Sequence, residues 1–151
     1  MEYSNHAEFM QIAIDQARLS LKKGCGPVGC IVVKNGEVIA SGHNEEALRC
    51  DPTAHAEIVV IQKACQVVSS KYLDGCVLYS TLQLCAMCTV ACIWARVECI
   101  VYGARREDVP ARYFSEKSIS VNELVHDSTQ PFIELVPGIL VDECAALYKN
   151  K

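Results

Sequence analysis

The stretch that decides the fold reads Asp51-Pro52-Thr53-Ala54-His55-Ala56-Glu57. Its polar start suits a cap-like entry into a helix, which the apolar pattern predicts from residue 54 to about residue 68. His55 and Glu57 would therefore stand in the first turns of that helix. A histidine and a carboxylate so placed are held on one rigid element.

A second stretch, Cys85-Ala86-Met87-Cys88, opens another apolar helix, predicted over residues 85–95. A short apolar strand is predicted just before it, over residues 76–80. The two helix starts should then face one another beyond strand ends, where open α/β sheets bind their ligands. The sequence thus predicts that the two stretches share one site.

The rest of the chain alternates between helices and strands. Asn35-Gly36 is a strong signal for a two-residue hairpin between two antiparallel strands. Residues 108–120 contain Pro110 and are predicted to be a loop or lid over a site. The other expected elements are a helix over 9–21, strands over 29–33, 37–41, 98–102 and 132–136, and helices over 120–126 and 141–148. This order predicts one α/β domain over residues 1–151.

His55, Cys85 and Cys88 are the nitrogen and sulfur ligands that zinc prefers. Three protein ligands leave a fourth position for water, whose pKa zinc lowers to about 7. We therefore expect one catalytic Zn²⁺ per chain, with Glu57 free to act on protons. Cys92, one helical turn beyond Cys88, could also approach the metal, but a buried core role is favoured for it.

Composition limits the kind of protein. The chain is 51% hydrophobic and 21% charged, a globular balance. A net charge of −4 and a pI of about 5.5 argue against a broad nucleic-acid surface. The first ten residues lack the features of a signal peptide, and no apolar stretch reaches the roughly 18 residues of a membrane span. We expect a cytoplasmic protein without membrane contact, whose ten cysteines are reduced thiols.

Three segments together resemble the cytidine deaminase superfamily, in the branch that contains guanine deaminases, cytosine deaminases and tRNA adenosine deaminases. They are Gly26-Pro27-Val28-Gly29, the stretch 51–57, and Thr81-Leu82-Gln83-Leu84-Cys85-Ala86-Met87-Cys88. His-x-Glu followed by Pro-Cys-x-x-Cys is the signature of zinc-dependent nucleobase deaminases. Here Leu84 replaces the proline and Gln83 the usual glutamate. The resemblance implies a three-layer α/β/α fold with a mixed five-stranded sheet and helices on both faces.

The resemblance also implies roles for residues of the site. His55, Cys85 and Cys88 would hold zinc, and Glu57 would carry protons from water to the ring and the leaving ammonia. Asn44 would hydrogen-bond the substrate, although it could be only a turn residue. The backbone N–H of Ala56 would meet an exocyclic carbonyl of suitable rings.

Other residues are compared with guanine deaminases. The helix segment around Trp94 resembles the corresponding segment of bacterial guanine deaminases. By the same comparison, Phe114 would stack on a base and Glu116 would accept hydrogen bonds from ring N–H groups. The alternatives are a core tryptophan and a surface loop. Members of this branch are usually homodimers, and the apolar segment 91–95 is a candidate interface.

Two substrate classes stay open. The preferred one is a free nucleobase or a related small amino-heterocycle, guanine-like or cytosine-like, which suits the acidic charge. The other is a tRNA wobble adenosine flipped into the pocket, because residues 138–147 resemble the final helix of those enzymes. A non-catalytic zinc-binding homologue is a third, weaker alternative, and it would require Glu57 to be idle.

Overall fold

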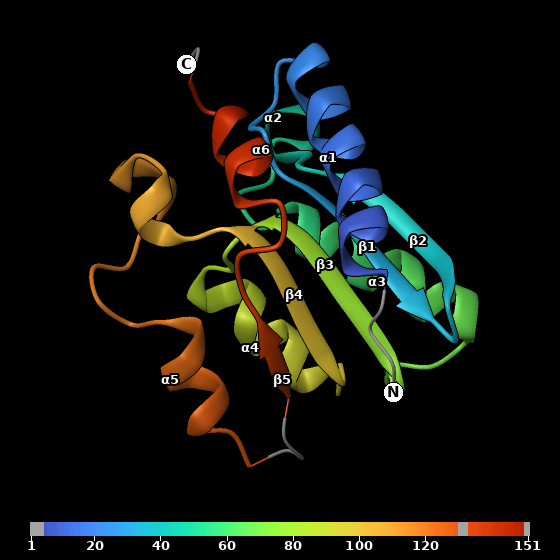
Figure 1. Ribbon diagram of the computed structural model, residues 1–151. Helices are drawn as coiled ribbons and strands as arrows, with labels where there is room; N and C mark the ends of the chain where they lie inside the picture. The colour runs from blue at the N-terminus through green and yellow to red at the C-terminus, as the bar shows by residue number, and fades with distance from the viewer. Residues whose placement is uncertain (1–4, 130–132, 150–151) are drawn as a thin grey trace.

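One five-stranded sheet organises the part of the chain that the computed structural model describes, residues 5–129 and 133–149 (Figure 1). The strands are β1 Gly29–Lys34, β2 Glu37–His43, β3 Cys76–Leu82, β4 Cys99–Ala104 and β5 Glu134–Val136. They lie in the order β2-β1-β3-β4-β5. β1 is antiparallel to β2 and β3, whereas β4 is parallel to β3 and β5. The predicted mixed sheet is confirmed.

The turn between β1 and β2 is the predicted hairpin. Asn35 and Gly36 both adopt positive φ, 51° and 77°, and Lys34 pairs with Glu37 across the turn. Such a turn requires residues that tolerate the left-handed region, which asparagine and glycine do. The local sequence is therefore enough to set this part of the register.

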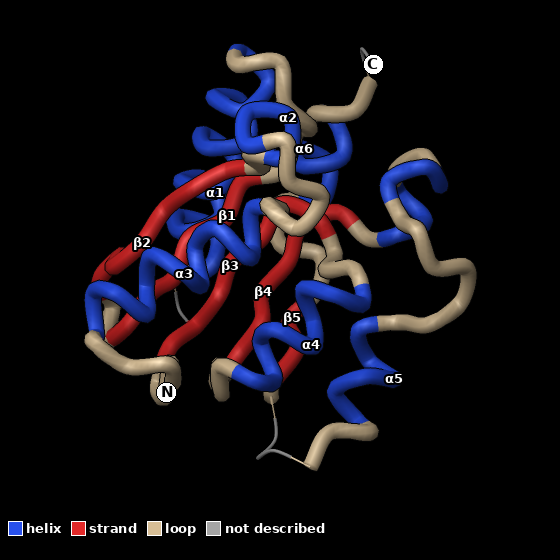
Figure 2. Tube along the Cα trace, turned by 180° about the vertical axis from the view of Figure 1, so that it is seen from behind, coloured by secondary structure: helices blue, strands red, loops and turns tan. Residues whose placement is uncertain are grey.

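Helices cover both faces of the sheet (Figures 1 and 2). α1 (His6–Lys22) and α6 (Val141–Ala146) lie on one face, and α3 (Ala56–Val68) and α4 (Ala86–Trp94) lie on the other. β3 is buried along its whole length, and its side chains alternate between two cores. Leu78 packs in the core that contains α3 and α4, and Tyr79 packs in the core that contains α1 and α6. The predicted three-layer arrangement is confirmed.

The start of α3 differs from the prediction by two residues. The helix begins at Ala56, and its N-cap is His55, in extended conformation with φ −65° and ψ 153°. The side chain of Asp51 closes the preceding turn instead of capping the helix. Its Oδ1 accepts hydrogen bonds from the backbone N–H of Thr53 at 2.8 Å and from its hydroxyl at 2.7 Å. His55 therefore stands at the N-terminal end of α3, where its ring can face the start of α4.

Other boundaries shift by a few residues. The central strands run two residues further than predicted, to 82 and 104, and the closing helix ends at 146. A one-turn helix, α2 (Glu46–Arg49), was not predicted, and the short helix α5 (Val121–His126) was. Phe132, the predicted start of the last strand, lies outside the described residues. Within those residues, no helix has the length and apolarity to cross a membrane.

Candidate active site

The starts of α3 and α4 bring three metal-binding side chains together, as the sequence predicts. The donor atoms of His55, Cys85 and Cys88 all lie within 4.8 Å of one another. His55 Nδ1 is 3.6 Å from Cys85 Sγ and 3.5 Å from Cys88 Sγ. Cys92 is not part of this group; it is fully buried in the core. One imidazole and two thiols form a donor set that zinc favours, with room for a fourth, non-protein ligand.

The three side chains of the group share protons with one another. A hydrogen bond from Cys88 is the main reason that the pKa of Cys85 falls to about 4, and His55 adds to the shift. The hydrogen bond with Cys85 also raises the pKa of His55 to about 9. Cys85 is the N-cap of α4 and Cys88 lies in its first turn, where the helix dipole stabilises negative charge. The hydrogen bond with Cys85 and burial raise the pKa of Cys88, so Cys85 carries the negative charge of the metal-free pair. A metal ion at this point would displace the protons that the group shares.

Glu57 lies beside the metal-binding group and is almost completely buried, with 4% of its surface exposed. Its Oε1 accepts a hydrogen bond from the Ser80 hydroxyl at 2.8 Å, and its Oε2 lies 3.4 Å from Cys88 Sγ. Burial raises the pKa of this carboxyl. A carboxyl group with a raised pKa, fixed next to a site for zinc, is suited to general acid–base chemistry. Sequence reasoning did not single out Ser80, because only the strand register places it under Glu57.

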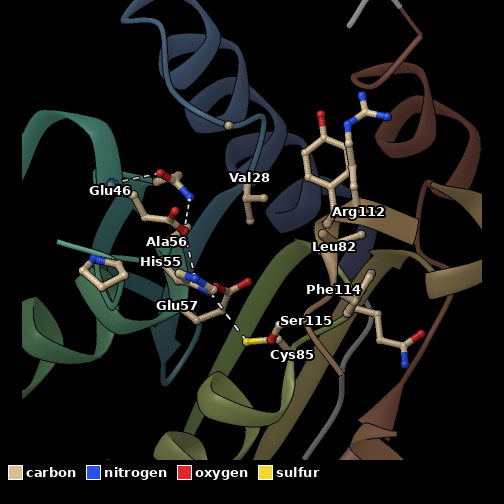
Figure 3. Close-up of a pocket in the computed structure, with 15 residues that line it drawn as sticks. Val28, Glu46, His55, Ala56, Glu57, Leu82, Cys85, Arg112, Phe114 and Ser115 are labelled. Carbon is tan, nitrogen blue, oxygen red and sulfur yellow. Dashed lines mark hydrogen bonds and ion pairs between the residues drawn. The ribbon is translucent and has the colours of Figure 1, made fainter. Parts of the chain in front are cut away.

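Glu46 is a second acid that sequence reasoning missed. Its Oε1 lies 2.8 Å from His55 Nε2 and accepts a hydrogen bond from Asn44 Nδ2 at 3.1 Å (Figure 3). Its backbone N–H donates to Asn44 Oδ1 at 3.0 Å. No local pattern in residues 44–50 predicted this, since the contact with His55 depends on how α2 packs beside α3.

A pocket of about 480 Å³ opens in front of this group (Figure 3). Its volume falls in the range of small-molecule sites. It is lined by Gly26, Val28, Asn44, Glu46, Pro52, His55, Ala56, Glu57, Leu82, Gln83, Cys85, Arg112, Tyr113, Phe114 and Ser115. Asn44, Ala56 and Phe114, which the sequence predicts to contact substrate, are therefore in place to do so. The predicted loop over the site is also found, since residues 112–115 form one wall.

Two predicted substrate contacts lie elsewhere. Trp94 is 75% exposed and does not line the pocket. It is the last residue of α4, a helix of nine residues whose first turn is at the site, so it stands roughly 12 Å away along the axis. Trp94 is also not the core residue that was the alternative.

Glu116 is outside the pocket lining as well. Its Oε1 accepts hydrogen bonds from the backbone N–H of Ala86 at 3.0 Å and from Arg106 Nη2 at 3.1 Å. It therefore ties the pocket loop to the start of α4. The two residues before Cys85 differ from the family pattern, and both have a place in the structure. Leu84 is buried in the core, and Gln83 Oε1 accepts a hydrogen bond from the backbone N–H of Arg106 at 2.9 Å.

Comparisons with known proteins identify the family of the chain. The model of the MafB19-like deaminase family matches residues 4–134. Guanine deaminase of Bacillus subtilis (strain 168) is 36% identical over 134 residues, which span 87% of this chain and 86% of that protein. The tRNA-specific adenosine deaminase of Aquifex aeolicus (strain VF5) is 44% identical over 96 residues, and the match covers 64% of each chain, just under two thirds.

A solved structure from work on A-to-I editing by tRNA:A34 deaminases has a TM-score of 0.80 and 32% identity. The match covers 93% of this chain and 98% of that one. The resemblance to the branch that contains guanine and tRNA adenosine deaminases is confirmed. The chain belongs to the MafB19-like deaminase family.

Proposed function

We propose that this protein catalyses the zinc-dependent hydrolytic deamination of a free nucleobase or a related small amino-heterocycle. The observation that carries the proposal is the buried carboxyl of Glu57 beside the group of His55, Cys85 and Cys88 in a pocket of about 480 Å³. In the reaction, the C–N bond to the amino group breaks, water supplies the oxygen of the new carbonyl, and ammonia leaves.

The residues divide the work as follows. Zinc held by His55, Cys85 and Cys88 would supply hydroxide at neutral pH by lowering the pKa of water. Glu57 takes a proton from the attacking water, gives it to a ring nitrogen, and then assists the leaving ammonia. The Ser80 hydroxyl holds Glu57 in place at 2.8 Å. Asn44 orients the ring.

The walls and charges of the pocket support a small substrate. Tyr113 and Phe114 close one side, and Val28 and Leu82 add apolar surface, which suits a flat ring. The nearby arginines 105 and 106 form ion pairs with Asp108 and Glu116. Their charge is therefore balanced within the protein, in a chain whose net charge is −4. Phosphate binding would require clustered basic charge.

A second candidate is a tRNA wobble adenosine. It is favoured by the structural match that covers 98% of a chain studied as a tRNA:A34 deaminase, and by Arg112, a basic residue in the pocket lining. The base would have to leave its stack and enter the pocket, as in other enzymes that modify bases. The same Glu57 chemistry would then act on adenine.

Ammonia release tests the proposal. The zinc-loaded protein is given guanine, cytosine, adenine, creatinine and the available nucleosides, with Glu57→Ala as the blank. Release from one free compound that is lost in the variant supports a small-molecule deaminase and identifies the substrate class. If zinc is bound and no compound reacts, an inosine assay on tRNA decides between the second candidate and a non-catalytic homologue, in which Glu57→Ala would change nothing.

A further inference from the structure

A single carboxylate, that of Glu46, contacts both the metal-binding and the substrate-binding parts of the site. His55 turns Nδ1 toward Cys85 and Cys88, at 3.6 and 3.5 Å, and turns Nε2 toward Glu46 Oε1, at 2.8 Å. The nitrogen that faces the sulfur donors is the one available to a metal. Nε2 then carries the hydrogen and donates a hydrogen bond to Glu46, and this contact sets the tautomer of His55.

Asn44 is held by the same residue through a reciprocal pair of hydrogen bonds. The Glu46 backbone N–H donates to Asn44 Oδ1 at 3.0 Å, and Asn44 Nδ2 donates to Glu46 Oε1 at 3.1 Å. A donor on one side and an acceptor on the other determine which way the amide points. One N–H and one lone pair of Asn44 are then left for a ring in the pocket.

The neighbouring acid in the chain shows a different pattern. Glu45, whose side chain is 20% exposed, pairs with Arg49, four residues further along the chain. Glu46, whose side chain is 40% exposed, instead points into the pocket, where it joins residues 44 and 55. A surface role in a one-turn helix would not require these contacts.

We propose that Glu46 is a positioning residue that couples zinc binding to substrate binding, by fixing the tautomer of His55 and the amide orientation of Asn44. The inference rests on the proposed function for the roles of zinc and Asn44. Partners of metal-ligating histidines typically account for 10- to 100-fold in metal affinity or activity. Glu46 should affect two separate quantities, zinc affinity and KM, because it contacts a residue of each kind.

The experiment compares Glu46→Ala and Glu46→Gln with the matched control Glu45→Gln. Zinc affinity is measured by competition with a chelator, and KM and kcat are measured with saturating zinc on the substrate found in the ammonia assay. Glu46→Ala should bind zinc about 10- to 100-fold more weakly and show a raised KM. Glu46→Gln keeps an oxygen that can accept both hydrogen bonds, so its KM should return most of the way to that of the wild type. Glu45→Gln should match the wild type.

A double variant tests the coupling itself. In the background of Asn44→Ala, the further change Glu46→Ala should lower zinc affinity as it does in the wild type. It should raise KM no further, because the Asn44 amide that Glu46 orients is gone. The inference is overturned if Glu46→Ala keeps the zinc affinity of the wild type, or if the two changes raise KM independently. Zinc affinity is measured without any substrate, so an inactive wild type that binds zinc would count against the proposed function, while the zinc-affinity comparison of the Glu46 variants would still test the role of Glu46 at His55.

Discussion

Replacing Arg106 by alanine is expected to release the loop that forms one wall of the pocket. The Arg106 guanidinium donates to the carbonyl oxygens of Glu116, Lys117 and Ile119 at 2.7, 3.2 and 3.4 Å, and to the Glu116 carboxylate at 3.1 Å. It also lies 4.3 Å from the centre of the Phe114 ring. These contacts hold residues 114–119 against Arg106, which follows the end of β4.

The magnitude follows from the burial of the ion pair. The side chains of Arg106 and Glu116 are 25% and 14% exposed, so the pair is screened only in part. Hydrogen bonds to charged groups contribute about 1.5–3 kcal/mol each, but the freed loop carbonyls can bind water, and we therefore expect a total loss of about 2–3 kcal/mol. That loss corresponds to a roughly 30- to 150-fold increase in local opening. KM should rise, because Tyr113 and Phe114 line the pocket.

Hydrogen exchange reads out the loop directly. The amides of Tyr113 and Phe114 donate to Pro110 and Ala111 at 3.2 and 3.1 Å, and their protection should fall by the same factor in Arg106→Ala. The matched control is Arg105→Ala, which removes the same charge from a solvent-exposed ion pair with Asp108. Equal protection of the two amides in both variants would refute the reasoning.

Three further predictions concern other parts of the site. Cys88→Ser should abolish stoichiometric zinc binding, whereas Cys92→Ser should keep one zinc per chain; metal analysis of the purified variants tests this, and zinc loss from both would restore Cys92 as a ligand. Burial raises the pKa of Glu57, so above about pH 4.3 the unfolded chain loses this proton before the folded one does. The metal-free wild type should then lose stability relative to Glu57→Gln as the pH rises from there, until the pKa of the folded state is passed. Thermal unfolding in which the wild type keeps or gains stability relative to Glu57→Gln over this range contradicts the prediction. Trp94→Ala should change the free energy of unfolding by less than about 0.5 kcal/mol and leave KM unaltered, because the side chain is 75% exposed. Sedimentation of the same variant shows whether the substitution weakens the predicted homodimer.

The layers of the fold could be predicted because their signals are local. Helical spacing, a buried strand and the Asn35-Gly36 turn are each contained in a few consecutive residues. The exact start of α3 could not, because Asp51 has two possible uses, capping the helix or closing the turn before it. In the structure Asp51 closes the turn with Thr53. The homodimer, the cytoplasmic location and the single domain over residues 1–151 stay predictions.

The sequence by itself determined the five strands, the longer helices and the residue types at the centre of the site. His55, Glu57, Cys85 and Cys88 are recognisable from type and spacing, since each pair occupies one helix start. Only the tertiary structure decided which residues support them. Ser80 reaches Glu57 through the strand register, Glu46 reaches His55 through the packing of α2, and Trp94 points outward at the far end of α4. These relations join residues far apart in the chain or depend on which end of a helix faces the pocket, and no local pattern encodes them.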